Sequence, residues 1–184
     1  MNSHFSLLAR FYDRVIPFVR LDQMLRVLAL PDAGSLLDAG GGTGRVAEAL
    51  RPHVGWIVVA DVSYEMLAQA RQKDLSAAST ETENLPFPEG TFDRVLMVDA
   101  LHHVTNQAET VRELYRVLKV GGRLVIEEPD VRRLAVRLIA VAEKLALMRS
   151  HFLAPPEIAR LFPTGAKVRI ESEDNTTWVI AEKG

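Results

Sequence analysis

The stretch Leu36-Leu37-Asp38-Ala39-Gly40-Gly41-Gly42-Thr43-Gly44 decides how this sequence folds. It ends an apolar run that predicts a strand over 35–39, and it leads into a helix predicted over 43–50. The glycines between the two elements let the backbone pass close to a ligand with no side chain in the way, and the helix N-terminus adds free N–H groups. The stretch therefore predicts a ligand-binding loop between a strand and a helix.

A second carboxylate belongs with this loop. Asp61 follows the apolar run Trp56–Ala60, which predicts the next strand, and it comes 17 residues after Gly44. In a parallel sheet the carboxyl end of that strand lies beside the loop, where a carboxylate can accept hydrogen bonds from both hydroxyls of a ribose. Hydrogen bonds to a charged group contribute about 1.5–3 kcal/mol each. The loop and Asp61 together predict a site for a nucleoside.

The spacing of the glycines distinguishes two nucleoside cofactors. A dinucleotide loop reads G-x-G-x-x-G, but Arg45 stands where the third glycine would be, so the spacing from Gly40 is G-x-G-x-G. Asp38 would repel a pyrophosphate and would attract a ligand that carries ammonium and sulfonium groups. This favours S-adenosylmethionine. A nicotinamide-dependent oxidoreductase is a disfavoured alternative, and the purely structural interpretation is a glycine turn with a helix-capping Asp38.

The rest of the chain alternates between strands and helices. Further helices are predicted around 8–15 and over 21–30, 63–73, 107–118 and 131–149, with a short one near Pro155-Pro156. Further strands are predicted over 75–80, 92–98, 123–127, 167–171 and 176–181, with Gly121-Gly122 as a turn. Such alternation implies a parallel sheet with both faces covered, and the final hairpin would add an antiparallel strand.

Composition excludes several classes of protein. The 184 residues are 48% hydrophobic and 25% charged, which is typical of a globular chain of one domain and excludes full disorder. A formal charge of -2 argues against a dedicated nucleic-acid binder. The absence of cysteine excludes disulfides, thiolate metal sites and cysteine nucleophiles. With no basic leader and no apolar stretch of about 18–20 residues, we expect a cytoplasmic protein without an integral membrane segment.

Several segments of the chain resemble, in order, the motifs of class I S-adenosylmethionine-dependent methyltransferases: 36–50, 58–67, 83–87, 92–104 and 116–126. The chain is most similar to the subgroup that contains the ubiquinone/menaquinone biosynthesis C-methyltransferases, which Phe11-Tyr12-Asp13 also resembles. The resemblance implies a doubly wound, mostly parallel α/β sheet of seven strands in the Rossmann-like order 3-2-1-4-5-7-6. It also implies an N-terminal helical lid over 1–30 and a cofactor-binding domain over 31–184.

The resemblance further implies which residues bind S-adenosylmethionine: Tyr12, Asp38, Gly40, Gly41, Gly42, Gly44, Asp61, Val62, Met66, Glu81, Thr82, Asp99, Ala100 and Leu101. The glycine loop would wrap the methionine part, with Asp38 near its ammonium and Tyr12 reaching its carboxylate. Asp61 would hold the ribose, and Val62 and Met66 would lie against the adenine.

The sequence also departs from the family pattern. Glu81-Thr82 stands where the more usual pair is Asp-Ala, so the contact with the adenine amino group is less secure. Asp99, Ala100 and Leu101 would still lie close to the sulfonium. The segment after the fifth strand is short, so the identity of the acceptor does not carry over from larger relatives.

His102 and His103 are the candidate catalytic residues, because they follow the fourth predicted strand and histidine titrates near neutral pH. The alternative is that they pack a loop or cap a helix. Alignment alone supplies about 7–11 kcal/mol in such a displacement, so a base is not obligatory. Three acids after the fifth strand are candidates to line the substrate site: Glu127, Glu128 and Asp130. The other histidines show no ligand spacing, and we predict no metal.

The sequence thus predicts methyl transfer from S-adenosylmethionine to a small acceptor that is quinone-like or otherwise lipophilic, and no nucleic-acid partner. The alternative is a regulatory or interaction module that binds S-adenosylmethionine or S-adenosylhomocysteine without catalysis. Residues 131–149 carry a charge of +4, which fits either a helix that covers the sheet or site, or peripheral contact with a membrane surface. Monomer and homodimer both stay open.

Overall fold

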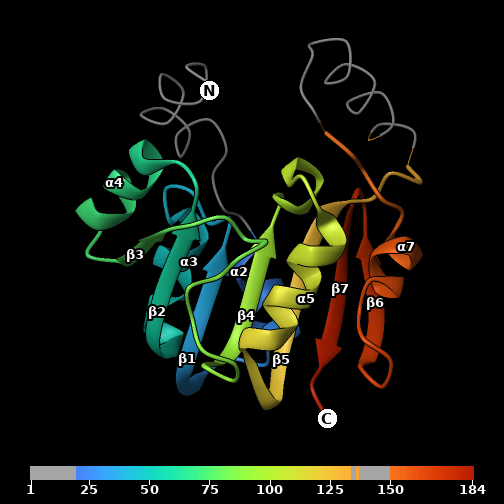
Figure 1. Ribbon diagram of the computed structural model, residues 1–184, viewed down its shortest axis with the longest axis horizontal. Helices are drawn as coiled ribbons and strands as arrows, with labels where there is room; N and C mark the ends of the chain where they lie inside the picture. The colour runs from blue at the N-terminus through green and yellow to red at the C-terminus, as the bar shows by residue number, and fades with distance from the viewer. Residues whose placement is uncertain (1–19, 134–135, 137–149) are drawn as a thin grey trace.

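The computed structural model describes residues 20–133, 136 and 150–184 (Figure 1). Its strands form one sheet in the order β3-β2-β1-β4-β5-β7-β6, which confirms the predicted order. The strand bounds are Asp32–Ala39 for β1, Val54–Asp61 for β2, Ser76–Ser79 for β3, Phe92–Val98 for β4, Leu118–Pro129 for β5, Lys167–Glu173 for β6 and Thr176–Glu182 for β7.

The parallel strands all have their carboxyl ends at the same edge of the sheet. Strands β3, β2, β1, β4 and β5 pair in parallel, and β7 runs antiparallel to both β5 and β6, as the final hairpin predicts. The carboxyl ends of β2, β1, β4 and β5 therefore meet at one edge, the upper edge in Figure 1. In open α/β sheets this is the edge that binds ligands.

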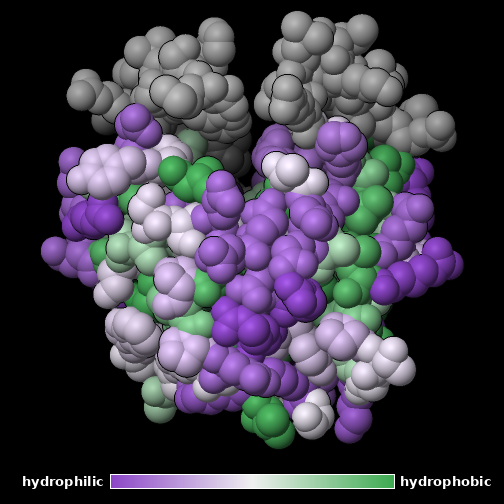
Figure 2. All heavy atoms as spheres, in the orientation of Figure 1, coloured by the Kyte–Doolittle hydropathy of each residue, from purple (hydrophilic) through white to green (hydrophobic). Residues whose placement is uncertain are grey.

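Helices cover both faces of the sheet. The helix bounds are Leu21–Leu28 for α2, Arg45–Leu50 for α3, Tyr64–Gln72 for α4, Gln107–Val117 for α5 and Pro155–Arg160 for α7, with 3-10 turns at Arg51–His53 and Leu101–His103. Figure 1 shows α5 in front of the sheet and α2 and α3 behind it. Alternate strand residues serve the two layers: Leu37 packs with the α5 side and Leu36 with the α2 side. Hydrophilic side chains dominate the outer surface over α5 (Figure 2).

The fifth strand differs from its prediction. We expected a strand over 123–127 after a Gly121-Gly122 turn, but both glycines lie inside β5. The register against β4 shifts there, from the pair Phe92–Leu118 to the pair Arg94–Arg123, so the extra residues form an irregularity within the strand. Gly122 is needed at this point, because a Cβ would lie 2.8 Å from the Lys119 carbonyl oxygen.

The first described helix of the chain is α2. Helix α2 buries Met24, Val27 and Leu28 in the core cluster behind the sheet. The helix predicted around 8–15, and most of the one predicted over 131–149, lie outside the described residues. The division into a lid over 1–30 and a domain over 31–184 stays a prediction. No helix in the described part is long and apolar enough to cross a membrane.

Candidate cofactor site

The glycine loop follows β1 and packs between the carboxyl ends of β2 and β4, the two strands that flank β1. Gly40 donates its N–H to the Ala60 carbonyl at the end of β2 (2.7 Å). Its φ of +71° is a conformation that favours glycine, and a Cβ would lie 2.7 Å from the Ala100 Cβ after β4. Gly44 precedes α3 with a φ of +72°, and a Cβ there would lie 2.4 Å from Leu75. The backbone of the loop therefore lies at the carboxyl edge of the sheet, as predicted.

Asp38 is a buried carboxylate at the end of β1. Its side chain is 1% exposed, and neither oxygen has a hydrogen-bond partner among the described residues. Burial raises the pKa of Asp38 to about 7, and the Asp61 charge adds to this rise, while the Arg45 charge and the Ala47 backbone N–H oppose it. A buried, unpaired carboxylate is costly, and a cationic group beside it would offset that cost. Asp38 therefore fits a ligand with an ammonium group.

Asp61 lies beside the loop, at the end of β2. Its Oδ2 accepts a hydrogen bond from the Gly42 N–H (2.9 Å), and its Oδ1 accepts one from the Ser63 N–H (2.8 Å). Burial raises the pKa of Asp61 against these bonds, which lower it. An ionised carboxylate has about four acceptor positions, so both oxygens keep capacity for a diol. The structure thus places Asp61 where the sequence predicts the ribose.

Val62 and Met66 lie next to this carboxylate. Met66 is buried at the start of α4, and its Sδ would be 3.0 Å from a Cβ on Gly42. The Ser63 side chain accepts from the Met66 N–H (3.3 Å), which confirms Ser63 as the predicted N-cap. Val62 is 67% exposed, an apolar surface that a flat ring could cover. Their contact with adenine stays a prediction.

Glu81 and Thr82 are placed differently from each other. Glu81 is exposed, whereas Thr82 is buried and its hydroxyl lies 3.3 Å from the Thr110 hydroxyl of α5. The Thr82 side chain therefore faces α5, so Thr82 would contact the adenine ring through its backbone N–H, while Glu81 would accept from the amino group. Recognition of the adenine by these two residues stays a prediction.

The segment after β4 brings one of its three predicted residues, Ala100, against the glycine loop. Asp99 has a φ of +50°, a strained conformation for a residue with a side chain, and donates its N–H to the Glu127 carbonyl (3.0 Å). Ala100 approaches Gly40, as described above. Leu101 is buried in the core on the α5 side, and its N–H donates to Glu128 Oε1 (2.8 Å). Leu101 therefore packs the core rather than facing the loop.

The two candidate catalytic histidines are held by neighbouring side chains. His102 is buried, its Nδ1 lies 2.5 Å from Glu128 Oε2, and its ring stacks on Phe152 with 4.3 Å between centroids. His103 is exposed, and its Nδ1 lies 3.4 Å from the Ser150 hydroxyl. These are the contacts expected of the packing alternative. A role as base stays a prediction for both histidines, and Tyr12 lies outside the described residues.

The pair of Glu127 and Trp178 has no counterpart in the predicted site. Both side chains are buried, and Trp178 Nε1 donates to Glu127 Oε2 (2.6 Å). Burial raises the pKa of Glu127 to about 7; the Trp178 hydrogen bond lowers it and the Asp99 charge raises it. Glu127 follows the fifth predicted strand, but only the antiparallel register of β5 and β7 reveals Trp178 opposite it.

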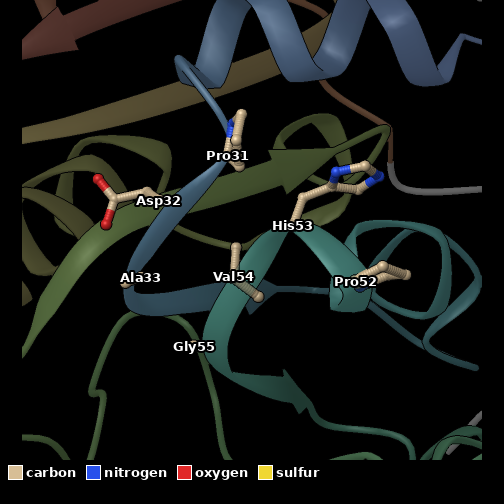
Figure 3. Close-up of a pocket in the computed structure, with 7 residues that line it drawn as sticks. All are labelled: Pro31, Asp32, Ala33, Pro52, His53, Val54 and Gly55. Atoms are coloured by element: carbon tan, nitrogen blue, oxygen red, sulfur yellow. The ribbon is translucent and has the colours of Figure 1, made fainter.

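A pocket lies at the opposite edge of the sheet from these residues. It is formed at the amino ends of β1 and β2 (Figure 3), and its lining residues are Pro31, Asp32, Ala33, Pro52, His53, Val54 and Gly55. Figure 3 shows Asp32 and His53 pointing apart, and Asp32 pairs with Arg94 instead. Within the described residues, no group of three or more His, Asp or Glu side chains could hold a metal ion.

Comparison with known proteins finds a family match in the middle of the chain. A family model described as a methyltransferase domain matches residues 37–126, which begin in β1 and end in β5. This stretch contains the glycine loop, Asp61 and the segment after β4.

Over these residues the chain is similar to the class I S-adenosylmethionine-dependent methyltransferases. It is 36% identical over 104 residues to the ubiquinone/menaquinone biosynthesis C-methyltransferase UbiE of Coxiella burnetii, covering 50% of this chain and 42% of that one. It is 35% identical over 105 residues to the UbiE of Escherichia coli O1:K1 / APEC, covering 51% and 42%. The matches thus span less than half the length of these relatives.

Solved structures share the whole fold. A methyltransferase from Thermotoga maritima superimposes with a TM-score of 0.82 at 23% identity and covers 98% of both chains. A second from Aquifex aeolicus has a TM-score of 0.76 at 20% identity and covers 96% of this chain and 97% of its own. Family and fold therefore imply S-adenosylmethionine as the cofactor, in agreement with the glycine spacing.

Proposed function

We propose that this protein transfers the methyl group of S-adenosylmethionine to a small acceptor with a quinone-like ring. The observation that carries the proposal is Asp38, a buried carboxylate directly behind a glycine loop with no hydrogen-bond partner among the described residues. Its unsatisfied charge suits a cationic ligand and opposes the pyrophosphate of a dinucleotide.

The residues at the carboxyl edge would divide the work of binding. Asp38 would hold the ammonium group, and Asp61 the ribose hydroxyls, with Gly42 and Ser63 fixing its orientation. The bound cofactor supplies an electrophilic methyl carbon. The protein's task is then to align the acceptor with that carbon and to exclude water, and alignment of this kind supplies about 7–11 kcal/mol.

The quinone-like acceptor is the finer part of the proposal. It is supported by the UbiE relatives, which are named as C-methyltransferases of ubiquinone and menaquinone biosynthesis. The Thermotoga maritima structure, whose name suggests histamine as acceptor, is under 25% identical and supports the fold alone. A cytoplasmic location, peripheral membrane contact through 131–149, and the choice between monomer and homodimer stay predictions.

A transfer assay tests the proposal. Purified protein is incubated with S-adenosylmethionine labelled in the methyl group and with a methoxy-substituted 1,4-hydroquinone, and histamine serves as the comparison acceptor. We expect label on the hydroquinone and equal amounts of S-adenosylhomocysteine. Cofactor binding without transfer to either acceptor would contradict the proposal and would favour the non-catalytic binding module.

A further inference from the structure

Glu127 and Glu128 lie at the carboxyl end of β5, on the far side of β4 from the glycine loop. The loop follows β1 and Asp61 ends β2, while β4 separates β1 from β5. Neighbouring strands are about 4.8 Å apart, so the end of β5 lies roughly 10 Å from the end of β1. In-line displacement requires the acceptor on the side of the methyl group opposite the sulfur. A cofactor over β2, β1 and β4 therefore leaves the β5 end for the acceptor.

The two glutamates differ in how many of their carboxylate oxygens have a hydrogen-bond partner. Glu128 uses both: Oε1 accepts from the Leu101 N–H (2.8 Å), and Oε2 lies 2.5 Å from His102 Nδ1. Glu127 uses one, because Trp178 Nε1 donates to Oε2 and no described residue donates to Oε1. The Trp178 bond also fixes the carboxylate in place, since both side chains are buried on neighbouring strands.

We propose that Glu127 is the general base of the methyl transfer, an inference that rests on the proposed function. In this step the proton that the acceptor loses moves to Glu127 Oε1. The electron pair freed on the acceptor forms the new bond to the methyl carbon. The carbon–sulfur bond breaks with its pair on sulfur, which gives S-adenosylhomocysteine, and Glu127 then releases the proton to solvent. One proton and one methyl group change places on the acceptor.

The charges around Glu127 suit this task. Burial and the Asp99 charge after β4 raise its pKa, while the Trp178 hydrogen bond and the charges of Arg20, before α2, and Arg45, in α3, lower it. The result is a pKa of about 7. A base works best when its pKa lies near the working pH, where it is both available and strong enough.

Glu127→Gln is the decisive variant, because glutamine keeps the volume and can still accept the Trp178 hydrogen bond but cannot take a proton. With the hydroquinone acceptor we expect kcat to fall by about 10²–10⁴-fold. The fall of kcat on the acid side of the pH profile, with an apparent pKa near 7, should disappear. Affinity for S-adenosylmethionine by calorimetry should stay within about twofold. Glu128→Gln is the matched control, in which the pH dependence should remain.

A second readout needs no acceptor. The chain has two tryptophans, so Trp56→Phe leaves Trp178 as the fluorescent reporter beside Glu127. Its emission should titrate with a midpoint near pH 7, and the transition should vanish in Trp56→Phe/Glu127→Gln. No transition between pH 5.5 and 8.5 would overturn the proposal, as would a Glu127→Gln enzyme with wild-type kcat. Failure of the wild type to bind the cofactor would instead contradict the proposed function itself.

Discussion

Asp38 and Asp93 are carboxylates on the same sheet whose pKa values move in opposite directions. Asp38 has no partner among the described residues, and burial raises its pKa to about 7. Burial also raises the pKa of Asp93, but hydrogen bonds from Lys119 and from the Ser35 N–H and hydroxyl outweigh it and lower the pKa to about 2. We propose that the first carboxylate serves a ligand; the second links β1, β4 and β5 through Ser35 and Lys119.

Asp38→Asn should therefore stabilise the ligand-free protein while weakening cofactor binding. The folded pKa of Asp38 lies above its unfolded value, so the folded state binds more protons between about pH 4 and 7 and stability falls as pH rises through that window. Asparagine removes this loss. We expect the Tm at pH 8 to rise by about 4 °C or more, with a smaller rise at pH 5. Affinity for S-adenosylmethionine should fall at least about tenfold.

Asp93→Asn is the control for this measurement. Its folded pKa lies below the unfolded value, so its contribution is present above about pH 4 and is lost as pH falls toward 2. The substitution should lower the Tm at pH 8. If thermal unfolding followed by circular dichroism showed both variants shifting in the same direction, the different roles of the two carboxylates would be refuted.

At the scale of single elements, the end of α5 is closed by a residue from far along the chain. Lys183, just after β7, donates from Nζ to the carbonyl oxygens of Tyr115 (3.0 Å), Arg116 (3.3 Å) and Leu118 (2.9 Å). The helix dipole also favours a cation at this end. Lys183→Met should lower the Tm by about 2–8 °C and leave cofactor affinity unchanged. Lys167→Met, on the exposed face of β6, removes the same charge and should shift the Tm by less; an equal shift would contradict the capping role.

Elements that are determined by local signals were predictable from the sequence. The strand at 92–98 and the helix start at Ser63 match the structure, because apolar runs and caps are local signals. The predicted start of the fifth strand was wrong. The glycine pair that would mark a turn in the sequence instead forms an irregularity within β5, where the strand pairs with β4. The propensities of Gly121 and Gly122 alone carry no information about the pairing with β4.

At the scale of the whole molecule, the alternation of strands and helices predicts the layers, and the family resemblance predicts the strand order. The parallel arrangement of the first two predicted strands predicts that the loop, Asp38 and Asp61 meet at one edge. The pairs Glu127–Trp178 and Glu128–His102 could not be predicted, because each joins side chains from segments 51 and 26 residues apart whose meeting depends on strand register and on the loop after β4. The sequence predicts the acids as candidates to line the substrate site but does not predict their partners.

Calorimetry on the purified protein tests the central claim most directly, that this carboxyl edge binds S-adenosylmethionine. S-adenosylmethionine, S-adenosylhomocysteine and NAD are titrated into the wild type and into Asp61→Ala. We predict binding of both adenosyl ligands in the micromolar range, no binding of NAD, and an affinity at least about tenfold weaker in Asp61→Ala with its fold retained. Tight binding of NAD, no binding of either adenosyl ligand to folded protein, or an unchanged affinity in Asp61→Ala would contradict the assigned site.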